Sequence, residues 1–298
     1  MSNGDIIGKA YSKICSEYER LNIQPDHIAR FGLKPGWNVV IGVRGCCGIA
    51  MSFGGNNPRY ADPETNFDPS ELQPYIGMSL IDFAKKHLKD PIIRRRSMTV
   101  AALNALSQPL VSDQVMKAKG YDTAIDLPRL ISLDDVIAIV GYGGLVKEYM
   151  GRCKELHVTD QRPISSFVTT IIGETIERWP DCIRVHTEKE NRGVLSHADV
   201  VFITGSTLVN GTFDEVIRHA KNARLRCLYG SSAQIIPDVL FENGIDVVMS
   251  VAITDPRQFE QDVRYAPDME GALKSRQRKY TVSCISRGTA GTHHFLRS

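Results

Sequence analysis

Residues 136–160 constrain the fold of this chain more than any other stretch of its sequence. A continuous apolar run, residues 136–140, ends in a glycine-rich turn at residues 141–144, and a stretch of helical pattern follows over residues 145–153. Such a run is typical of a buried parallel strand, and glycines let the chain turn tightly into the helix that follows. The stretch therefore predicts the first strand–turn–helix unit of a doubly wound, Rossmann-like domain.

The same unit contains positions at which such domains often bind a nucleotide. Asp160 lies about twenty residues after Gly141, at the end of the next apolar segment, where an acidic side chain often accepts ribose hydroxyls. Val146 stands where the dinucleotide fingerprint has its last glycine, so the unit predicts a ligand site without specifying a dinucleotide. Its candidate residues are Gly141, Tyr142, Gly143, Gly144 and Asp160.

The second half of the chain alternates strand and helix patterns. Further strands are expected at residues 155–159, 200–204, 226–229 and 247–251, and an edge strand at 280–285. Helices are expected at residues 145–153, 213–223 and 237–243. Five apolar strands joined by helices predict a parallel sheet with right-handed crossovers and helices on both faces.

The first half has a different order. Residues 5–21 have apolar groups at helical spacing, residues 37–43 and 49–53 favour strands, and residues 80–88 and 92–106 favour helices. This order is typical of a smaller α+β domain. The sequence therefore predicts an N-terminal α+β domain at residues 1–130 and a Rossmann-like domain with a C-terminal tail at residues 131–298.

Composition excludes several classes of protein. The net charge is +2 over 298 residues, which gives no support to binding of nucleic acid or of an acidic membrane surface. No apolar stretch approaches the roughly twenty residues that span a bilayer, and the N-terminus does not resemble a signal peptide. Seven scattered cysteines without a CxxC pattern do not suggest disulfides. We expect a reduced, cytoplasmic protein.

A second candidate site follows the strand expected at residues 200–204. Short polar side chains and glycines gather there, at the carboxyl edge of the sheet, and suit a carboxylate, a phosphate or an ordered hydroxyl ligand. These residues are Thr204, Gly205, Ser206, Thr207, Asn210 and Thr212. The alternative is a simple helix cap at Thr212. Ser231, Ser232 and Gln234 follow the next strand and are expected to line the same crevice.

The first half offers weaker candidates. The adjacent thiols of Cys46 and Cys47 could bind a soft metal, but neighbouring side chains on a strand point to opposite faces, so two small half-buried side chains are the better interpretation. An arginine of residues 94–96, with Arg96 as our candidate, could reach the cleft between domains and meet an anion. The alternative is a solvated helix face. The histidines show no metal-ligand spacing, and no GxSxG, P-loop or HExxH motif is present.

Three segments together resemble the putative heavy-metal-chelation domain family: residues 141–146 (Gly-Tyr-Gly-Gly-Leu-Val), residues 204–212 (Thr-Gly-Ser-Thr-Leu-Val-Asn-Gly-Thr) and residues 229–246. Residues 97–106 resemble a helix of the usual N-terminal partner domain, which is similar in fold to the enolase N-terminal domain. The resemblance covers nearly the whole chain except the tail. It implies a Rossmann-like domain packed on the enolase-like domain, with residues 141–144, residues 204–212 and the helix containing Asn104 facing one cleft.

Two main functions remain open at this point. The resemblance implies a protein that handles a metal ion or a metal chelate, although the sequence contains no convincing set of metal ligands. The alternative is an enzyme of small-metabolite biosynthesis that uses a nucleoside cofactor, either S-adenosylmethionine or a dinucleotide. In both cases the partner is a small molecule, with Asn104 and Arg96 as candidate substrate-binding residues. A non-catalytic binding module and a homodimer are also compatible with the sequence.

Overall fold

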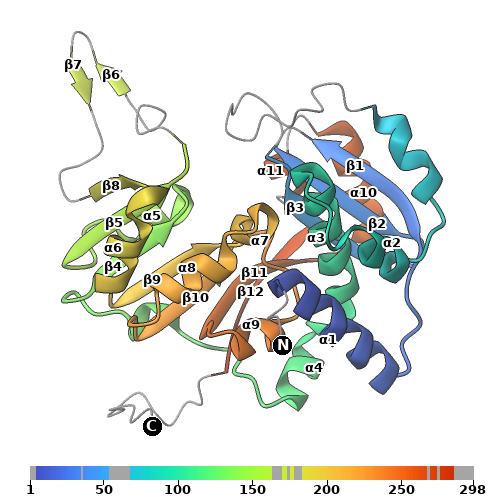
Figure 1. The fold of residues 1–298 in the computed structure, drawn as a ribbon, viewed down its shortest axis with the longest axis horizontal. Coiled ribbons are helices and arrows are strands. Elements are labelled where there is room, and N and C mark those ends of the chain that lie inside the picture. Colours follow the sequence, from blue (N-terminus) through green and yellow to red (C-terminus); the bar gives the residue numbers. More distant parts are fainter. Residues whose placement is uncertain are drawn as a thin grey trace.

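The computed structural model describes residues 5–34, 36–53, 68–162, 170–172, 175–177, 183–266, 269–273 and 276–284 (Figure 1). Two sheets form its frame. A three-stranded antiparallel sheet belongs to the N-terminal half, and a seven-stranded, mostly parallel sheet belongs to the C-terminal half. The predicted α/β class with a small N-terminal sheet is therefore confirmed.

The N-terminal half pairs its strands in sequence order, β1-β2-β3. Its elements are α1 (Ile6–Arg20), β1 (Ile28–Lys34), β2 (Trp37–Gly42), β3 (Cys47–Met51), η2 (Pro69–Tyr75), α2 (Leu80–His87), α3 (Ile93–Ser107), η3 (Gln108–Leu110), α4 (Asp113–Ala118) and η4 (Leu127–Leu130). The long helix α3 lies against β2 and β3 (Figure 1), and every residue from Ser97 to Ser107 is buried. Strand β1, at the edge, was not predicted from the sequence.

The C-terminal half forms the Rossmann-like sheet. Its elements are β4 (Val136–Val140), α5 (Gly144–Tyr149), β5 (Glu155–Asp160), β6 (Thr170–Ile172), β7 (Thr175–Glu177), β8 (Ile183–Thr187), η6 (Glu188–Glu190), α6 (Asn191–His197), β9 (Val200–Thr204), α7 (Ser206–Asn210), α8 (Phe213–His219), β10 (Leu225–Tyr229), α9 (Pro237–Glu242), β11 (Val247–Ile253), α10 (Pro256–Tyr265), α11 (Met269–Leu273) and β12 (Gln277–Ser283). The strand order is β12-β11-β10-β9-β4-β5-β8, and only β12 runs antiparallel to its neighbour; β6 and β7 pair separately.

Most predicted elements are present within a few residues of their expected bounds, and three differ. The helix expected at 145–153 ends at Tyr149, because Gly151 adopts a left-handed conformation with φ of 73°. The helix expected at 213–223 ends at His219. The loop expected at 204–212 contains the short helix α7, whose Leu208 and Val209 are buried. Strand β8 was missed, and the edge strand expected at 280–285 is β12, with Ile285 outside the described residues.

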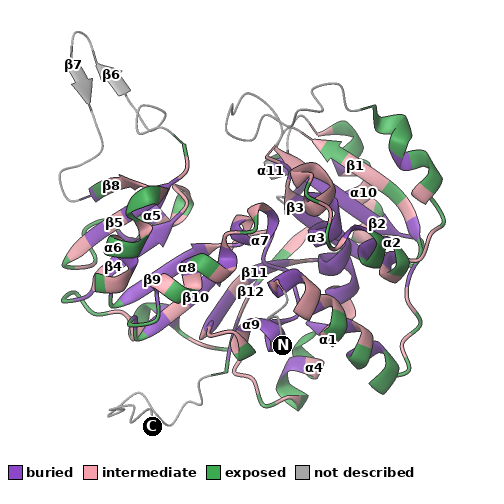
Figure 2. Cartoon of the chain, viewed as in Figure 1, coloured by how far each residue is buried: buried purple, intermediate pink, exposed green. Residues whose placement is uncertain are grey.

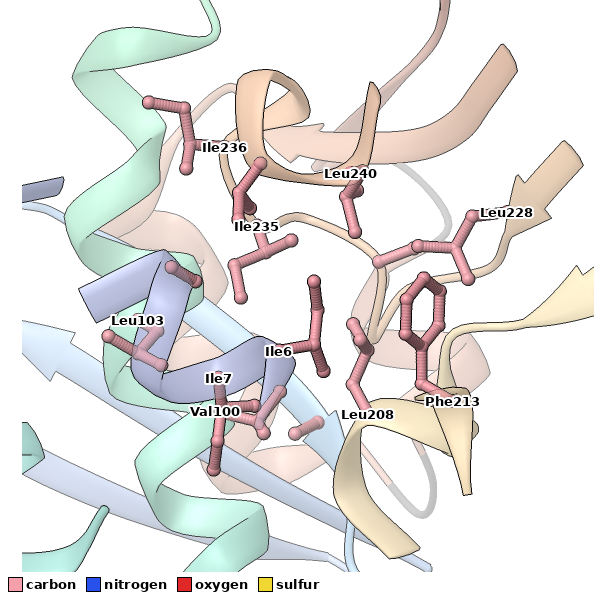
Figure 3. Close-up of a cluster of buried hydrophobic side chains, with 14 of the residues drawn as sticks. Ile6, Ile7, Val100, Leu103, Leu208, Phe213, Leu228, Ile235, Ile236 and Leu240 are labelled. Atoms are coloured by element: carbon pink, nitrogen blue, oxygen red, sulfur yellow. The ribbon is translucent and has the colours of Figure 1, made fainter. Parts of the chain in front are cut away.

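Helices cover both faces of the large sheet. On one face, side chains of α5 pack on alternate residues of β4, β5 and β9. On the other face, α6, α8 and α9 cover the remaining residues of β4, β9 and β10. This second core continues into the N-terminal half: Ile6 and Ile7 of α1 lie among side chains of α3, α7, α8 and α9 (Figure 3). The buried residues therefore form a band that crosses from one sheet to the other (Figure 2).

Buried hydrogen bonds also join the two halves. Gln234 accepts the Ile49 N–H at 3.0 Å and donates to the Val251 carbonyl at 3.1 Å. The Ser107 hydroxyl accepts the Ile236 N–H at 2.9 Å. Because such bonds have fixed directions, they set how β3 and α3 sit on the large sheet. Among the described residues, no helix is both long and apolar enough to cross a membrane.

Candidate functional site

A pocket lies where the strand order of the large sheet reverses. From β4 the chain passes to β5 and β8 on one side, then returns to β9 on the other side of β4. In open α/β sheets, ligands bind in the crevice beyond the carboxyl ends of the strands at this point. The pocket has a volume of about 850 Å³, and residues at or beyond the carboxyl ends of β4, β5, β9 and β10 line it together with Gly36, Met51 and Phe53 of the N-terminal half. We call it the strand-end pocket.

The strand-end pocket brings together nine of the residues predicted from the sequence. They are Gly141, Tyr142, Gly143, Asp160, Thr204, Ser206, Thr207, Asn210 and Thr212. All nine lie at or beyond the carboxyl ends of β4, β5 or β9, and that shared position explains why separate segments of the sequence meet in one pocket.

The turn after β4 has a conformation that suits glycine. Gly141 has φ of 92°, and a Cβ atom at this position would lie 2.9 Å from Cγ2 of Thr204. The Tyr229 hydroxyl donates to the Gly141 carbonyl at 2.8 Å. Burial raises the pKa of Tyr229 well above its usual range, so the phenol stays protonated and keeps donating. The turn is thus held in place by the neighbouring strands β9 and β10.

Asp160 serves this turn within the protein itself. Its Oδ1 accepts the Arg162 N–H at 2.8 Å and Nε at 3.1 Å, and its Oδ2 accepts the Tyr142 N–H at 2.8 Å and Arg162 Nη2 at 2.9 Å. Both oxygens therefore already have two donors each. The role expected from the sequence, accepting ribose hydroxyls, would require Asp160 to exchange these donors for a ligand.

The polar residues after β9 mostly hydrogen-bond to one another. Thr207 Oγ1 donates to the Thr204 carbonyl at 2.7 Å, and the Ser206 hydroxyl donates to Thr204 Oγ1 at 3.1 Å. Asn210 Nδ2 donates to Gln161 at 3.1 Å, while Asn210 Oδ1 accepts the Thr212 hydroxyl at 2.7 Å. Thr212 occupies the N-cap position of α8 but makes no side-chain capping bond, so the simple-cap alternative lacks its expected contact.

Seven predicted residues lie outside the pocket lining: Gly144, Gly205, Ser231, Ser232, Gln234, Asn104 and Arg96. The Asn104 amide donates to the carbonyls of Ile49 at 2.7 Å and Ser232 at 3.1 Å, so it joins the two halves. The Ser232 hydroxyl accepts the Met51 N–H at 3.0 Å and has the same joining role.

Arg96 does not reach the strand-end pocket. Its Nε donates to the Leu208 carbonyl at 3.2 Å, and its Nη2 lies 2.5 Å from Asp5 Oδ2. These contacts hold the C-terminal end of α7 against α1 and α3. The anion-binding position suggested for this arginine is therefore used by an internal carboxylate.

Sequence reasoning missed one wall of the pocket. Thr159, Lys189, Asn191 and Arg192 line it, and they belong to β5, η6 and α6. Thr159 precedes Asp160 at the same strand end, so its position offered a signal. The other three follow β8, the strand that the sequence pattern did not reveal.

The described residues do not provide a protein-only metal centre. No group of three or more His, Cys, Asp or Glu side chains among them is arranged to hold an ion. Cys46 and Cys47 pack on different clusters, and burial raises the pKa of the Cys46 thiol to about 12 and that of Cys47 further. A protonated thiol is a poor metal ligand, so these contacts favour the interpretation of two small packed side chains.

Two histidines far apart in sequence meet across the neighbouring strands β5 and β8. His157 Nδ1 lies 3.0 Å from His186 Nε2, His157 Nε2 lies 3.2 Å from Glu155, and His186 Nδ1 lies 3.1 Å from Glu190. The sequence showed no pairing of histidines, because this pair depends on the register of β5 against β8. Burial lowers the pKa of His157, and a neutral ring that donates from Nε2 to Glu155 leaves Nδ1 as an acceptor.

We expect this lowered pKa to make stability fall as the pH drops below about 6.5. The pKa of His157 is lower in the folded protein than in the unfolded chain, so on acidification the unfolded chain binds a proton at His157 first. Proton binding therefore favours the unfolded state. The loss is complete once the pH passes below the folded pKa. His157→Gln should flatten the curve of unfolding free energy against pH between 7.5 and 5, measured by urea unfolding. His197→Gln, on the exposed surface of α6, should keep the wild-type slope. An unchanged slope in His157→Gln would contradict the assignment.

Comparison with known proteins gives two matches to family models. A model described as "putative heavy-metal chelation" matches residues 123–282, which is more than half of the chain. A second model with the same description matches residues 18–107. An uncharacterised protein of Methanocaldococcus jannaschii is 29% identical over 194 residues, which is 64% of this chain and 66% of that protein.

Two crystal structures share the fold. A protein of unknown function from Pyrococcus horikoshii is 21% identical with a TM-score of 0.67, covering 93% of this chain and 99% of that one. A protein of unknown function from Desulfitobacterium hafniense is 19% identical with a TM-score of 0.63, covering 91% and 98%. At these identities the likeness establishes the arrangement of both halves and not their activity.

Proposed function

This chain belongs to the family described as "putative heavy-metal chelation", and from that premise we propose that it binds a metal ion as an organic chelate in the strand-end pocket. The observation that carries the proposal is the pocket itself. Its volume of about 850 Å³ falls within the roughly 300–1,000 Å³ typical of small-molecule sites. It lies at the reversal of strand order and takes lining residues from both halves of the chain.

The lining favours a chelate over a bare metal ion. Lys189 and Arg192 line the pocket without an ion pair in the described part of the chain, whereas its acids, Asp160, Glu188 and Glu215, each have a partner. The two unpaired positive charges repel a free cation but attract an anionic chelator. The lining also contains hydroxyl and amide groups, and they suit the oxygen and nitrogen atoms of an organic ligand. In this proposal the chelator provides the metal's ligands, and the protein recognises the chelator.

Native mass spectrometry of the purified protein, with elemental analysis of the same sample, tests this proposal. We expect an organic adduct, with metal present in proportion to it. Gly143→Phe should abolish the adduct: Gly143 lines the pocket, its φ of −160° suits any residue, and no atom lies within 4 Å of an added Cβ. Gly193→Phe, at an equally open position outside the lining, should retain it. The proposal would be contradicted by stoichiometric metal without an organic adduct, present in equal amounts in Gly143→Phe and Gly193→Phe.

A nucleoside-dependent enzyme is the second candidate. The strand order and the glycine turn at Gly141 favour it, because dinucleotides bind at this place in Rossmann folds. The occupied carboxylate of Asp160 and the missing last glycine weigh against it. The same spectra separate the two functions. A nucleoside-sized adduct that absorbs near 260 nm and carries no metal would support the enzyme.

A further inference from the structure

One wall of the strand-end pocket is formed by lining residues of β5, η6 and α6, and these three elements contact one another. Two of its buried polar atoms have no hydrogen-bond partner among the described residues. Thr159, the second-last residue of β5, is only 1% exposed, and its hydroxyl makes no hydrogen bond with the described residues. Asn191, the first residue of α6, has a buried Oδ1 in the same condition. Both residues line the pocket. In the rest of the lining, by contrast, Thr204, Thr207 and Asn210 all bond within the protein.

Two unpaired polar atoms in one wall are unfavourable for the protein alone. A buried donor or acceptor without a partner costs roughly 1–3 kcal/mol, and more than nine in ten buried polar groups avoid that cost. A ligand that bonds to both atoms recovers it. The hydroxyl of Thr159 can donate or accept, whereas Asn191 Oδ1 can only accept. The wall therefore matches a ligand with an acceptor next to an O–H or N–H donor.

The charges beside this wall indicate the kind of acceptor. Lys189 lies two residues before Asn191 and Arg192 directly follows it; both line the pocket and form no ion pair with the described part of the chain. Of the acids in the lining, Asp160 pairs with Arg162 at 2.9 Å and Glu215 lies 3.4 Å from His219, while Glu188 has a contact of its own. Lys189 and Arg192 are therefore available to bind an anionic group of the ligand.

We infer that the Thr159–Asn191 wall recognises a hydroxycarboxylate or aminocarboxylate group of the ligand. The carboxylate meets Lys189 and Arg192 and accepts from the Thr159 hydroxyl. The adjacent hydroxyl or amine donates to Asn191 Oδ1. A carboxylate beside a hydroxyl or amine also holds metal ions through its oxygen and nitrogen atoms, so the inference rests on the proposed chelate function and names the chemistry of the chelator.

Thr159→Val tests the role of the hydroxyl with two readouts. Valine has the same shape and favours a strand, so removing an unpaired hydroxyl should leave the urea midpoint of unfolding equal to or above that of the wild type. Binding of L-malate, followed by ligand-observed NMR, should weaken roughly tenfold. The matched variant Thr99→Val removes a buried hydroxyl that donates to the Arg95 carbonyl at 2.8 Å, so its midpoint should fall. A stable Thr159→Val with unchanged malate binding would overturn the inference.

Three probes that differ at one carbon test the donor. L-malate has a hydroxyl there, L-aspartate has an amine, and succinate has neither. We expect the preferred probe to bind roughly tenfold more tightly than succinate. Asn191→Leu should erase that preference, while Asn222→Leu, at an exposed position outside the lining, should preserve it. The preference between malate and aspartate identifies the hydroxyl or the amine.

Equal binding of all three probes, or binding of none at millimolar concentration, would overturn the inference. Either result leaves the proposed function standing if native mass spectrometry still finds an organic adduct that Gly143→Phe removes. An absent adduct together with a retained preference for malate or aspartate would instead overturn the proposed metal chelate and keep the recognition of the carboxylate.

Discussion

Replacing Gly48 with alanine is expected to destabilise the protein by roughly 3 kcal/mol or more. Gly48 lies in β3, directly against the backbone of α3. A Cβ atom there would lie far inside the contact distances of the Ala101 carbonyl oxygen and the Ala105 nitrogen. Because these are backbone atoms within a buried helix, they cannot move as a side chain would, and the strand must separate from the helix.

Urea unfolding measures this effect, and Gly8→Ala provides the matched control. Gly8 lies in α1 with no atom within 4 Å of an added Cβ, so alanine there should stabilise the helix by about 0.5–1 kcal/mol. The two substitutions add the same methyl group to the same half of the chain and should act in opposite directions. Equal unfolding midpoints for Gly48→Ala and the wild type would refute the close packing of β3 on α3.

Replacing Lys119 with methionine is expected to cost about 3 kcal/mol. Lys119 follows α4 and contacts two carboxylates, Glu17 of α1 at 3.0 Å and Asp238 of α9 at 2.6 Å. All three side chains are at most 15% exposed. Methionine preserves much of the volume but leaves two carboxylates close together in a poorly solvated place, where a missing partner costs more than the pair itself contributes.

The exposed pair between Lys13 and Glu242 joins the same two helices and provides the control. Its side chains are 32% and 57% exposed, and such pairs contribute roughly 0.2–1 kcal/mol. We expect Lys13→Met to shift the urea midpoint little and Lys119→Met to shift it strongly. The Lys119→Met defect should also shrink at low pH, because Arg20 and Lys119 lower the pKa of Glu17 and protonation removes its charge. Similar shifts for both variants would contradict a buried charge network at this junction.

Elements with a strong local pattern could be predicted from the sequence. The bounds of β4 and β9 match their apolar runs, because a buried parallel strand needs apolar residues throughout and its ends are marked by glycine or polar residues. Helix α7 could not be recognised, because its five residues Ser-Thr-Leu-Val-Asn have weak helix propensity. Packing of Leu208 and Val209 into the shared core decides its conformation.

The candidate site likewise contains residues that could be placed from the sequence and residues that could not. Gly141 and Thr204 could be placed together because each follows a strand of one parallel sheet, and parallel strands end at a common edge. Arg96 and Asn104 could not be assigned from the sequence, since their partners Asp5, Ile49 and Ser232 lie far away along the chain.

The sequence by itself determined the class of fold, the family and the strand ends at which the pocket lies, because these depend on local periodicity, glycines and short motifs. Only the tertiary structure decided which polar atoms are already bonded and which face the pocket unpaired. Asp160 is held by four donors, whereas the neighbouring Thr159 hydroxyl has no partner among the residues that the structure describes. The difference arises because the turn after β4 and Arg162 bring donors to Asp160, whereas no described residue brings a partner to the Thr159 hydroxyl.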